Sequence, residues 1–353
     1  MENSTLNHTH KICCFGEVLL RYSPQFGQTW LNQASMPVYV GGAEANVSTA
    51  LSKWGLATKY VSVLPDNQLS MEIKANLDAK NIDTSAFLFR GKRVGSYILP
   101  QGTDLKNSAV IYDREHSSFW GLKTGMIDWE AVLKGCTWFH FSAISPALNL
   151  NVAAVCEEAL QVAKRLNIRI SVDLNYRAKL WRYGKNPVEI MPELVQYCDL
   201  VMGNIWAANK LLGISIDPDV ERNIATKQDY LDHSIRTAKA IQAQFPACTS
   251  VANTFRFDLP TGEIQYFTTF FKDGVQVVSP EFLIASVVDK IGSGDCFMGG
   301  LIYGQSLGFS AQNTLNYATA AAYGKLQELG DATNQSVEDV IFNLERQQLV
   351  VMS

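Results

Sequence analysis

Residues 289–295 read DKIGSGD, and they place two glycines and two carboxylates directly before a helical, apolar pattern, CFMGGLIYGQSLGF. A strand-like run, FLIASVV, comes just before them. A helix that begins at Gly292-Ser293-Gly294 presents free backbone N–H groups and the positive end of its dipole at one point, an arrangement that binds anions. Asp295 adds a carboxylate that can accept a proton there. These residues indicate either a site for a reacting anion or, more simply, a tight turn followed by an acidic helix start.

The segment does not match three other glycine motifs. Phe297 stands where a dinucleotide-binding fingerprint has its third glycine, the G-K-[ST] ending of a P-loop is missing, and the G-x-S-x-G pattern of a nucleophile elbow does not fit. The chemistry must therefore be identified from the rest of the chain.

Composition limits the classes of protein that can carry this segment. The chain has 353 residues, 47% hydrophobic and 18% charged, which is enough to bury a large α/β core. A net charge of -4 gives no electrostatic footprint for nucleic acid or an anionic membrane, and no apolar stretch reaches the ~18 residues of a membrane span. Seven cysteines without a C-x-x-C pair predict free thiols in a reducing compartment, so we expect a cytoplasmic protein. The polar residues 1–10 predict a disordered tail.

Short apolar runs alternate with helical patterns along residues 11–353. Strands are predicted at KICCFGEVL, TKYVSVLP, WFHFSAI, IRISVDL, CDLVMGN and CTSVANTF, and helices at EANVSTALSKWG, NVAAVCEEALQVAKRLN and YLDHSIRTAKAIQAQF. Continuous apolar runs are typical of buried parallel strands, so the pattern predicts one layered α/β/α domain with right-handed crossovers. Two stretches, at about 19–40 and 92–115, are rich in Tyr, Gly, Ser and Pro and alternate in polarity, which predicts strands inserted outside the main sheet as a lid.

Three segments, GGAEANVSTAL at 41–51, DLNYR at 173–177 and DKIGSGDCF at 289–297, occur in an order and at spacings that resemble the ribokinase-like (PfkB) family of carbohydrate kinases. The resemblance runs from about Lys11 to Asp339 and is strongest to the 2-keto-3-deoxygluconate kinases, through FGEVLLRYSP, YDR and LNYRAKLW. It implies a three-layer α/β/α ribokinase-like fold with a mainly parallel central sheet and a small β-sheet lid. It also implies ATP and Mg²⁺ as cofactors.

The resemblance implies roles for individual residues. Asp295 would take the proton from the acceptor hydroxyl, and the amides of Gly292, Ser293 and Gly294 would form an anion hole for the transferred group. The implied substrate-binding residues are Gly41, Gly42, Asn46, Tyr97, Tyr112, Arg114, Ile144, Arg177 and Asp331. The implied nucleotide-binding residues are Asn175, Asn204, Asn253, Arg256, Gly292 and Gly294.

Residue chemistry supports part of this assignment. Tyr112 and Arg114 alternate with Asp113 and so share one face of a predicted lid strand, and Arg177 follows a strand at its carboxyl end, where open α/β sheets bind ligands. An arginine and a phenol suit a carboxylate and a hydroxyl. The histidines share no ligand spacing, so no protein metal site is expected. The alternatives left open are a solvated lid strand, a turn at Gly41 and Gly42, core packing at Ile144 and a surface position for Arg256.

The chain departs from the family pattern near the nucleotide. The family's N-x-x-E segment falls on Asn204-Ile205-Trp206-Ala207, so Ala207 replaces an acid that helps to hold magnesium-bound water, and Lys290 replaces a common threonine. Mg²⁺ in such sites rests largely on phosphates and water, so the loss of one acid need not abolish activity.

The sequence therefore predicts an ATP-dependent kinase that phosphorylates the terminal hydroxyl of 2-keto-3-deoxygluconate, a small-molecule sugar acid. Two alternatives stay open: a fructokinase-like or other sugar-acid kinase of the same family, and a catalytically impaired sugar-binding homologue, which Ala207 and Lys290 motivate. The apolar residues Trp30, Leu31 and Val38, with Val40, predict a homodimer through the lid.

Overall fold

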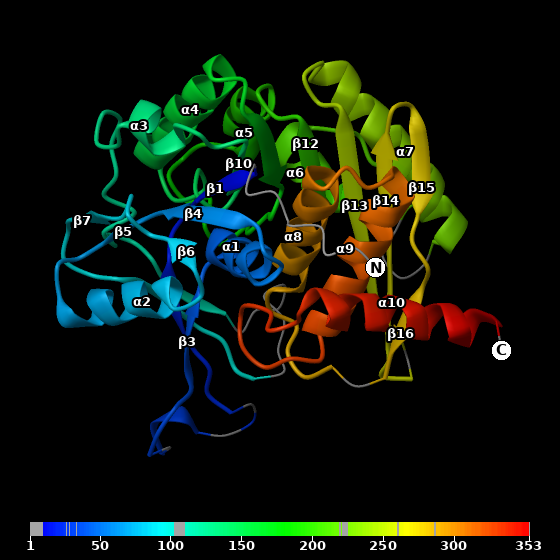
Figure 1. Ribbon diagram of the computed structural model, residues 1–353, viewed down its shortest axis with the longest axis horizontal. Coiled ribbons are helices and arrows are strands. Elements are labelled where there is room, and N and C mark those ends of the chain that lie inside the picture. Colours follow the sequence, from blue (N-terminus) through cyan, green and yellow to red (C-terminus); the bar gives the residue numbers. More distant parts are fainter. Residues whose placement is uncertain are drawn as a thin grey trace, which may run out of the picture.

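The computed structural model describes residues 10–352, apart from 26, 28, 33, 102–109, 219, 221–224, 260 and 286. The predicted tail at residues 1–10 lies outside the described residues except for His10. Within the described ranges the largest sheet has ten strands in the order β15-β14-β13-β12-β11-β10-β1-β4-β6, with β16 paired to β14 (Figure 1). Its strands are β1 Lys11–Phe15, β4 Ala57–Val61, β6 Ile82–Asp83, β10 Trp138–Ser142, β11 Arg169–Asp173, β12 Leu200–Gly203, β13 Ser250–Asp258, β14 Ile264–Lys272, β15 Val275–Val278 and β16 Phe282–Ile284.

Most neighbouring strands of this sheet run parallel. The pairings from β6 through β4, β1, β10, β11 and β12 to β13 are parallel, and antiparallel pairing begins between β13 and β14. The connections explain the change, because β13 and β14 are joined by a short turn, whereas parallel neighbours need a longer crossover.

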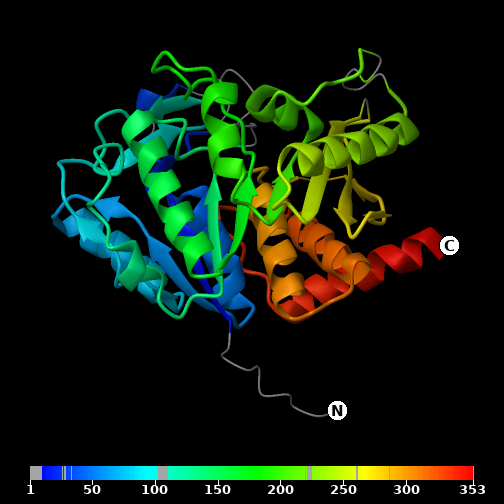
Figure 2. The same cartoon turned by 90° about the horizontal axis from the view of Figure 1, so that it is seen from above.

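Helices cover both faces of the central sheet (Figures 1 and 2). One buried cluster joins the sheet to α3–α7, and a second joins it to α1, α2 and α8–α10. Alternate residues of β1 belong to the two clusters: Cys13 and Phe15 lie in the first, and Ile12 and Cys14 lie in the second. Because both faces of the strand are buried, its sequence is an unbroken apolar run. The helices are α1 Ala43–Lys53, α2 Gln68–Asp78, α3 Trp129–Leu133, α4 Leu150–Arg165, α5 Pro187–Val195, α6 Ile205–Leu212, α7 Lys227–Gln244, α8 Ser293–Ser306, α9 Ala311–Lys325 and α10 Val337–Met352, with a 3₁₀ turn η1 at Trp30–Asn32.

A second, four-stranded sheet takes strands from both predicted lid stretches. Its order is β3-β2-β8-β9, and β2 pairs antiparallel with β3 but parallel with β8. The bounds are β2 Leu19–Tyr22, β3 Val38–Gly41, β8 Gly95–Ile98 and β9 Ile111–Asp113, and a separate small sheet pairs β5 Val63–Leu64 with β7 Leu88–Phe89. We refer to the four-stranded sheet as the lid sheet.

The single strand predicted at residues 11–19 is wrong, because the structure divides it between two sheets. β1 ends at Phe15 in the central sheet, and β2 begins at Leu19 in the lid sheet. At the break, a Cβ on Gly16 would lie 2.0 Å from a carboxylate oxygen of Glu44, and the Val18 amide donates to Ser62 Oγ at 3.0 Å instead of to a strand. Residues 16–18 are therefore the junction between the core and the lid sheet.

The layered architecture and the separate small sheet confirm the predicted fold class. Across the described residues, no helix is long and apolar enough to cross a membrane. The same residues include no group of three or more His, Cys, Asp or Glu side chains placed to hold a metal ion.

Candidate active site

A cavity of about 410 Å³ lies where residues after β11 and β12, the lid sheet and the start of α8 come together. This is the carboxyl edge of the parallel strands, where open α/β sheets bind ligands. The predicted site residues that line it are Gly42, Asn46, Tyr97, Tyr112, Arg114, Ile144, Asn175, Arg177, Asn204, Arg256, Gly292, Ser293, Gly294, Asp295 and Asp331. Its described lining does not include Gly41 or Asn253.

The start of α8 requires glycine for a steric reason. Gly292 precedes the helix in the left-handed conformation, with φ of 77°, and a Cβ on it would lie 1.8 Å from the carbonyl oxygen of Asp331. The amides of residues 293–295 precede the first intrahelical hydrogen bond of α8 and are free to bind an anion. Nothing lies within 4 Å of an ideal Cβ on Gly294, so a ligand can approach its backbone closely.

Asp295 stands in the first turn of α8, with 8% of its surface exposed. Asn46, on α1, donates from Nδ2 to Asp295 Oδ2 at 2.7 Å. Burial raises the pKa of Asp295 to about 7; the bond from Asn46 and the charge of Arg177 act against this rise, while Glu44 and Asp331 add to it. A carboxyl group with a pKa near neutrality can both take up and release a proton at physiological pH.

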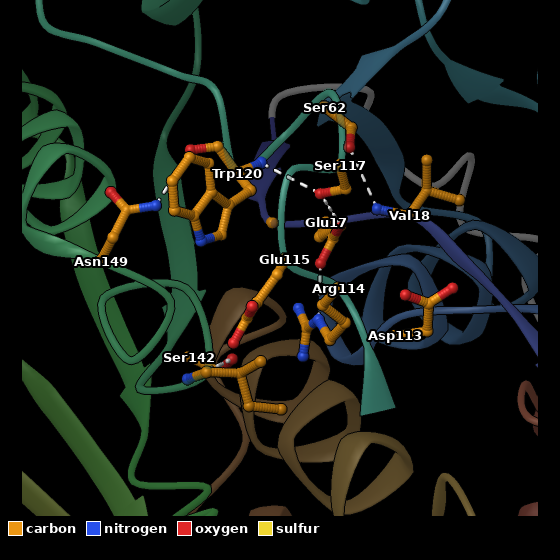
Figure 3. Close-up of polar contacts among 12 residues, drawn as sticks. Glu17, Val18, Ser62, Asp113, Arg114, Glu115, Ser117, Trp120, Ser142 and Asn149 are labelled. Atoms are coloured by element: carbon orange, nitrogen blue, oxygen red, sulfur yellow. Dashed lines mark hydrogen bonds and ion pairs between the residues drawn. The ribbon is translucent and has the colours of Figure 1, made fainter. Parts of the chain in front are cut away.

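Arg114 follows β9 and points into a buried ion pair with Glu17. Arg114 Nε donates to Glu17 Oε2 at 2.6 Å, and Ser117 Oγ donates to Glu17 Oε1 at 2.5 Å. Figure 3 shows Glu17 between these two partners, with the Trp120 amide donating in turn to Ser117 Oγ at 3.1 Å. Arg114 is 5% exposed and lines the cavity, so the alternative of a solvated lid strand does not apply to this residue.

Asp173 is the last residue of β11, and Arg177 lies in the loop that follows. Burial raises the pKa of Asp173 well above its ordinary value, the charge of Asp295 raises it further, and Arg177 lowers it. Arg177 donates from Nη1 to the Tyr176 carbonyl at 3.1 Å, which turns the guanidinium back over its own loop. Arg177 therefore lies within electrostatic reach of both carboxylates, on the side of the cavity that holds the start of α8.

A second buried network connects the lid sheet to the loop after α9. Arg21 pairs with Asp289 at 2.6 Å and with Asp331 at 2.7 Å, and Tyr97 donates to Asp331 Oδ2 at 2.9 Å. A Cβ on Gly41 would lie 2.3 Å from the same carboxylate, so Gly41 leaves room for it. Asp331 thus holds the lid sheet beside the site, and Asp289 is bound to the lid sheet through the same arginine.

The two predicted tyrosines lie opposite each other on the lid sheet. Tyr97 on β8 pairs with Tyr112 on β9, and their ring centroids are 6.2 Å apart. Both line the cavity, as does Ile144, whose amide donates to Ser142 Oγ at 3.3 Å. The tyrosines give this wall apolar surface together with hydroxyl groups.

The residues predicted for the nucleotide lie on several elements: Asn175 follows β11, Asn204 follows β12, Asn253 and Arg256 are on β13, and Gly292 and Gly294 are at the start of α8. Asn204 accepts from the Ala207 amide at 2.8 Å and caps α6, while Asn253 donates to the Gly203 carbonyl at 2.9 Å and ties β13 to β12. Arg256 and Asn175 line the cavity. Lys290 lines it too and pairs with Asp258 at 3.0 Å.

The cavity lining also includes residues that the sequence did not identify as site residues, among them Glu17, Glu44, Asp173, Trp206 and Lys210. Glu44 accepts from the amide and the hydroxyl of Ser142, at 2.8 and 2.6 Å, and so joins α1 to β10. Glu17, Glu44 and Asp173 each stand inside a motif already noted, and an acidic residue in an otherwise apolar motif was the available signal.

Residues 9–338 match the family model described as pfkB family carbohydrate kinase. The chain belongs to this family. It is an ATP-dependent carbohydrate kinase. Among its relatives, the 2-dehydro-3-deoxygalactonokinase of Haloferax volcanii is 27% identical over 339 residues, 94% of this chain and 97% of that protein. The probable fructokinase-2 of Arabidopsis thaliana is 24% identical over 304 residues, 86% of this chain and 83% of that protein.

Solved structures agree with the assignment. A crystal structure of 2-dehydro-3-deoxygluconokinase from Thermotoga maritima superposes with a TM-score of 0.85 at 32% identity, covering 95% of this chain and 99% of that one. This PfkB kinase thus shares its fold with a kinase named for a sugar acid and is similar in sequence to a kinase named for a neutral sugar.

Proposed function

We propose that this PfkB kinase transfers the γ-phosphoryl group of ATP to the terminal hydroxyl of 2-keto-3-deoxygluconate (2-dehydro-3-deoxygluconate). The observation that carries the proposal is one cavity that contains the buried Asp295 carboxylate beside free helix amides, together with Arg114 and Arg177. The carboxylate and the amides serve phosphoryl transfer to an alcohol, and the arginines favour an acceptor that is itself an acid. The related kinases named for keto-deoxy sugar acids support the same substrate class.

Asp295 is the general base of the proposed reaction. Asn46 holds one of its carboxylate oxygens, which leaves the other for the acceptor hydroxyl. With a pKa near 7, Asp295 is partly deprotonated at neutral pH and can accept the hydroxyl proton as the oxygen attacks. The start of α8 and Arg177 stabilise the charge on the transferred group.

The cavity suits a nucleotide phosphate chain at the end beyond β12. Arg256, Lys210 and Lys290 line that end and provide positive charge, and Asn204 lies at the start of α6. ATP supplies the phosphoryl group when bound. Asp173 and Asn175 provide oxygen atoms of the kind that Mg²⁺ prefers, so we place Mg²⁺ there together with phosphate and water ligands.

The test is ADP release with MgATP against 2-keto-3-deoxygluconate, its galactonate epimer, gluconate, fructose and ribose, with Asp295→Asn as the matched variant. Turnover of a keto-deoxy acid that is lost in the variant supports the reaction, the substrate class and the base together. Turnover of fructose alone would overturn the sugar acid and favour the fructokinase-like alternative. Sugar binding without ADP release, even at high magnesium, would favour the catalytically impaired homologue.

We also propose a homodimer formed through the lid sheets, in the cytoplasm. Leu31, Val38 and Ile111, on or next to the lid sheet, are 96%, 50% and 50% exposed and give this part of the surface apolar character. A second copy that covers these residues would also protect the strand edges. The seven cysteines are buried free thiols, which suits a reducing compartment.

A further inference from the structure

We infer that Glu17 is a specificity-determining residue that orients Arg114 toward a substrate carboxylate. Glu17 acts through Arg114, and it is therefore a positioning residue. The inference rests on the proposed function, because it assigns a role in selecting sugar acids. Glu17 lies in the junction between the core and the lid sheet, between β1 and β2, and Arg114 lies directly after β9 of the lid sheet.

The bond between the two residues leaves one edge of the guanidinium for a ligand. Glu17 Oε2 takes the Nε–H of Arg114 at 2.6 Å, and among the described residues Glu17 is the hydrogen-bond partner of the Arg114 side chain. An arginine binds a carboxylate in a bidentate manner either through Nε and one Nη or through both Nη atoms. Because Nε is occupied, the second mode remains, and Arg114 lines the cavity.

The Glu17 carboxylate is itself held from its other side. Ser117 Oγ donates to Oε1 at 2.5 Å and accepts from the Trp120 amide at 3.1 Å, so the serine hydroxyl is fixed in direction (Figure 3). Gly95, at the start of β8, leaves space for the carboxylate, since a Cβ there would lie 2.2 Å from Oε1. Glu17 is 2% exposed, and it is surrounded closely enough to hold Arg114 in a single orientation before any sugar binds.

Charge explains why an acid, rather than a neutral group, holds the arginine. A buried guanidinium without a partner is strongly destabilising, so Glu17 keeps Arg114 stable in the empty cavity. The pair has no net charge, and Arg177 adds the positive charge that a bound carboxylate requires. Glu17 therefore contributes direction, and Arg177 contributes charge.

A double-mutant cycle on the full-length kinase tests whether Glu17 acts through Arg114. Glu17→Gln, Arg114→Met and the double variant are compared with the wild type by kcat and KM for 2-keto-3-deoxygluconate, and by KM for ATP. We expect Glu17→Gln to raise the KM for the sugar acid about tenfold, with kcat and the KM for ATP changed less than about twofold. In the Arg114→Met background the same substitution should have no further effect on KM. Asp83→Asn is the control, because Asp83 lies on β6, outside the described cavity lining, and pairs with Lys11 at 3.0 Å.

Two results would overturn the inference. An equal rise in KM from Glu17→Gln in both backgrounds would show a general role in lid structure, and a fall in KM would show that the Glu17 charge opposes the substrate. If Glu17→Gln does not fold, Ser117→Ala is the second variant, because it keeps the Glu17 charge but removes the bond to Oε1. It should raise the KM for the sugar acid about threefold when Arg114 is present, and it should have no effect in the Arg114→Met background. Wild-type enzyme that turns over no sugar acid would refute the proposed function, whereas turnover without coupling between the two residues refutes this inference alone.

Discussion

Replacing Asn46 by alanine should shift the pH dependence of turnover to higher pH. Asp295 must be deprotonated to act as a base, so kcat falls as the pH falls through its pKa, which lies at about 7 in the wild type. Asn46 donates to Asp295 Oδ2 at 2.7 Å and stabilises the carboxylate form, so its removal raises the pKa. The acid limb of the profile therefore moves toward the alkaline side.

The size of the shift follows from the strength of one buried, charge-assisted hydrogen bond. Such a bond contributes about 1.5–3 kcal/mol, and one pKa unit corresponds to about 1.4 kcal/mol. Loss of the whole bond would therefore raise the pKa of Asp295 by about one to two units. Water that enters the space left by the amide replaces part of the bond, and we expect about one unit. At pH 7 the deprotonated fraction then falls from about one half to about one tenth, a loss of roughly fivefold in kcat that is recovered near pH 9.

The assay is ADP release at saturating sugar and ATP from about pH 5.5 to 9.5. Ser52→Ala is the matched control, because Ser52 lies on the same helix and donates to the Lys80 carbonyl at 2.6 Å, outside the described cavity lining. An unchanged midpoint together with a raised KM for the sugar would refute the reasoning. It would return Asn46 to the role of a sugar ligand, which the family resemblance implies.

Three other sets of variants test the anion site, the metal and the lid. Gly292→Ala should lower the free energy of unfolding by about 1–3 kcal/mol and abolish turnover, because Gly292 has φ of 77° and a Cβ there would lie 1.8 Å from a carbonyl oxygen. Gly294→Ala is the control and should keep the wild-type Tm, because nothing lies within 4 Å of a Cβ at that position. Equal thermal unfolding of the two variants would contradict this prediction. Ala207→Glu should lower the magnesium concentration that gives the half-maximal rate several-fold, because it returns an acid to the first turn of α6 beside Asn204. The measurement is a magnesium titration at fixed ATP, and an unchanged midpoint would show that the metal depends on other groups. Leu31→Glu should convert the dimer to a monomer, as measured by light scattering, because it puts a charge on an apolar position that is 96% exposed. A wild-type protein that is monomeric at micromolar concentration would refute the lid dimer.

Local sequence was sufficient for the helices predicted at residues 44–55, 151–167 and 230–245, and for the helix that begins at the GSGD segment. Residues 293–306 form α8 directly after Gly292, as the GSGD segment followed by an apolar pattern indicates. The strand before it is more distant than predicted, since β16 ends at Ile284 and the site is not a direct strand-to-helix turn. The amides at the start of α8 lack intrahelical partners for reasons that lie within one turn of the chain, and these reasons are visible in sequence.

Contacts between distant residues were beyond such reasoning. The apolar run at 11–19 reads as one strand, yet Gly16 must pass Glu44, and the chain then leaves the central sheet for the lid sheet. Asn46 and Asp295 meet across 249 positions of sequence, and Glu17 and Arg114 across 97. Periodicity predicts which face of an element is buried, but it does not predict which side chain lies opposite.

The sequence by itself determined the fold class and the family, and with them the carbohydrate kinase activity, because these depend on apolar periodicity and on motifs of a few adjacent residues. The tertiary structure decided how the site residues are used. Only in the folded chain does burial bring the pKa of Asp295 to about 7, and only there does Glu17 take the Nε–H of Arg114. Desolvation and hydrogen-bond direction are properties of the packed surroundings, so no single segment of the chain contains them.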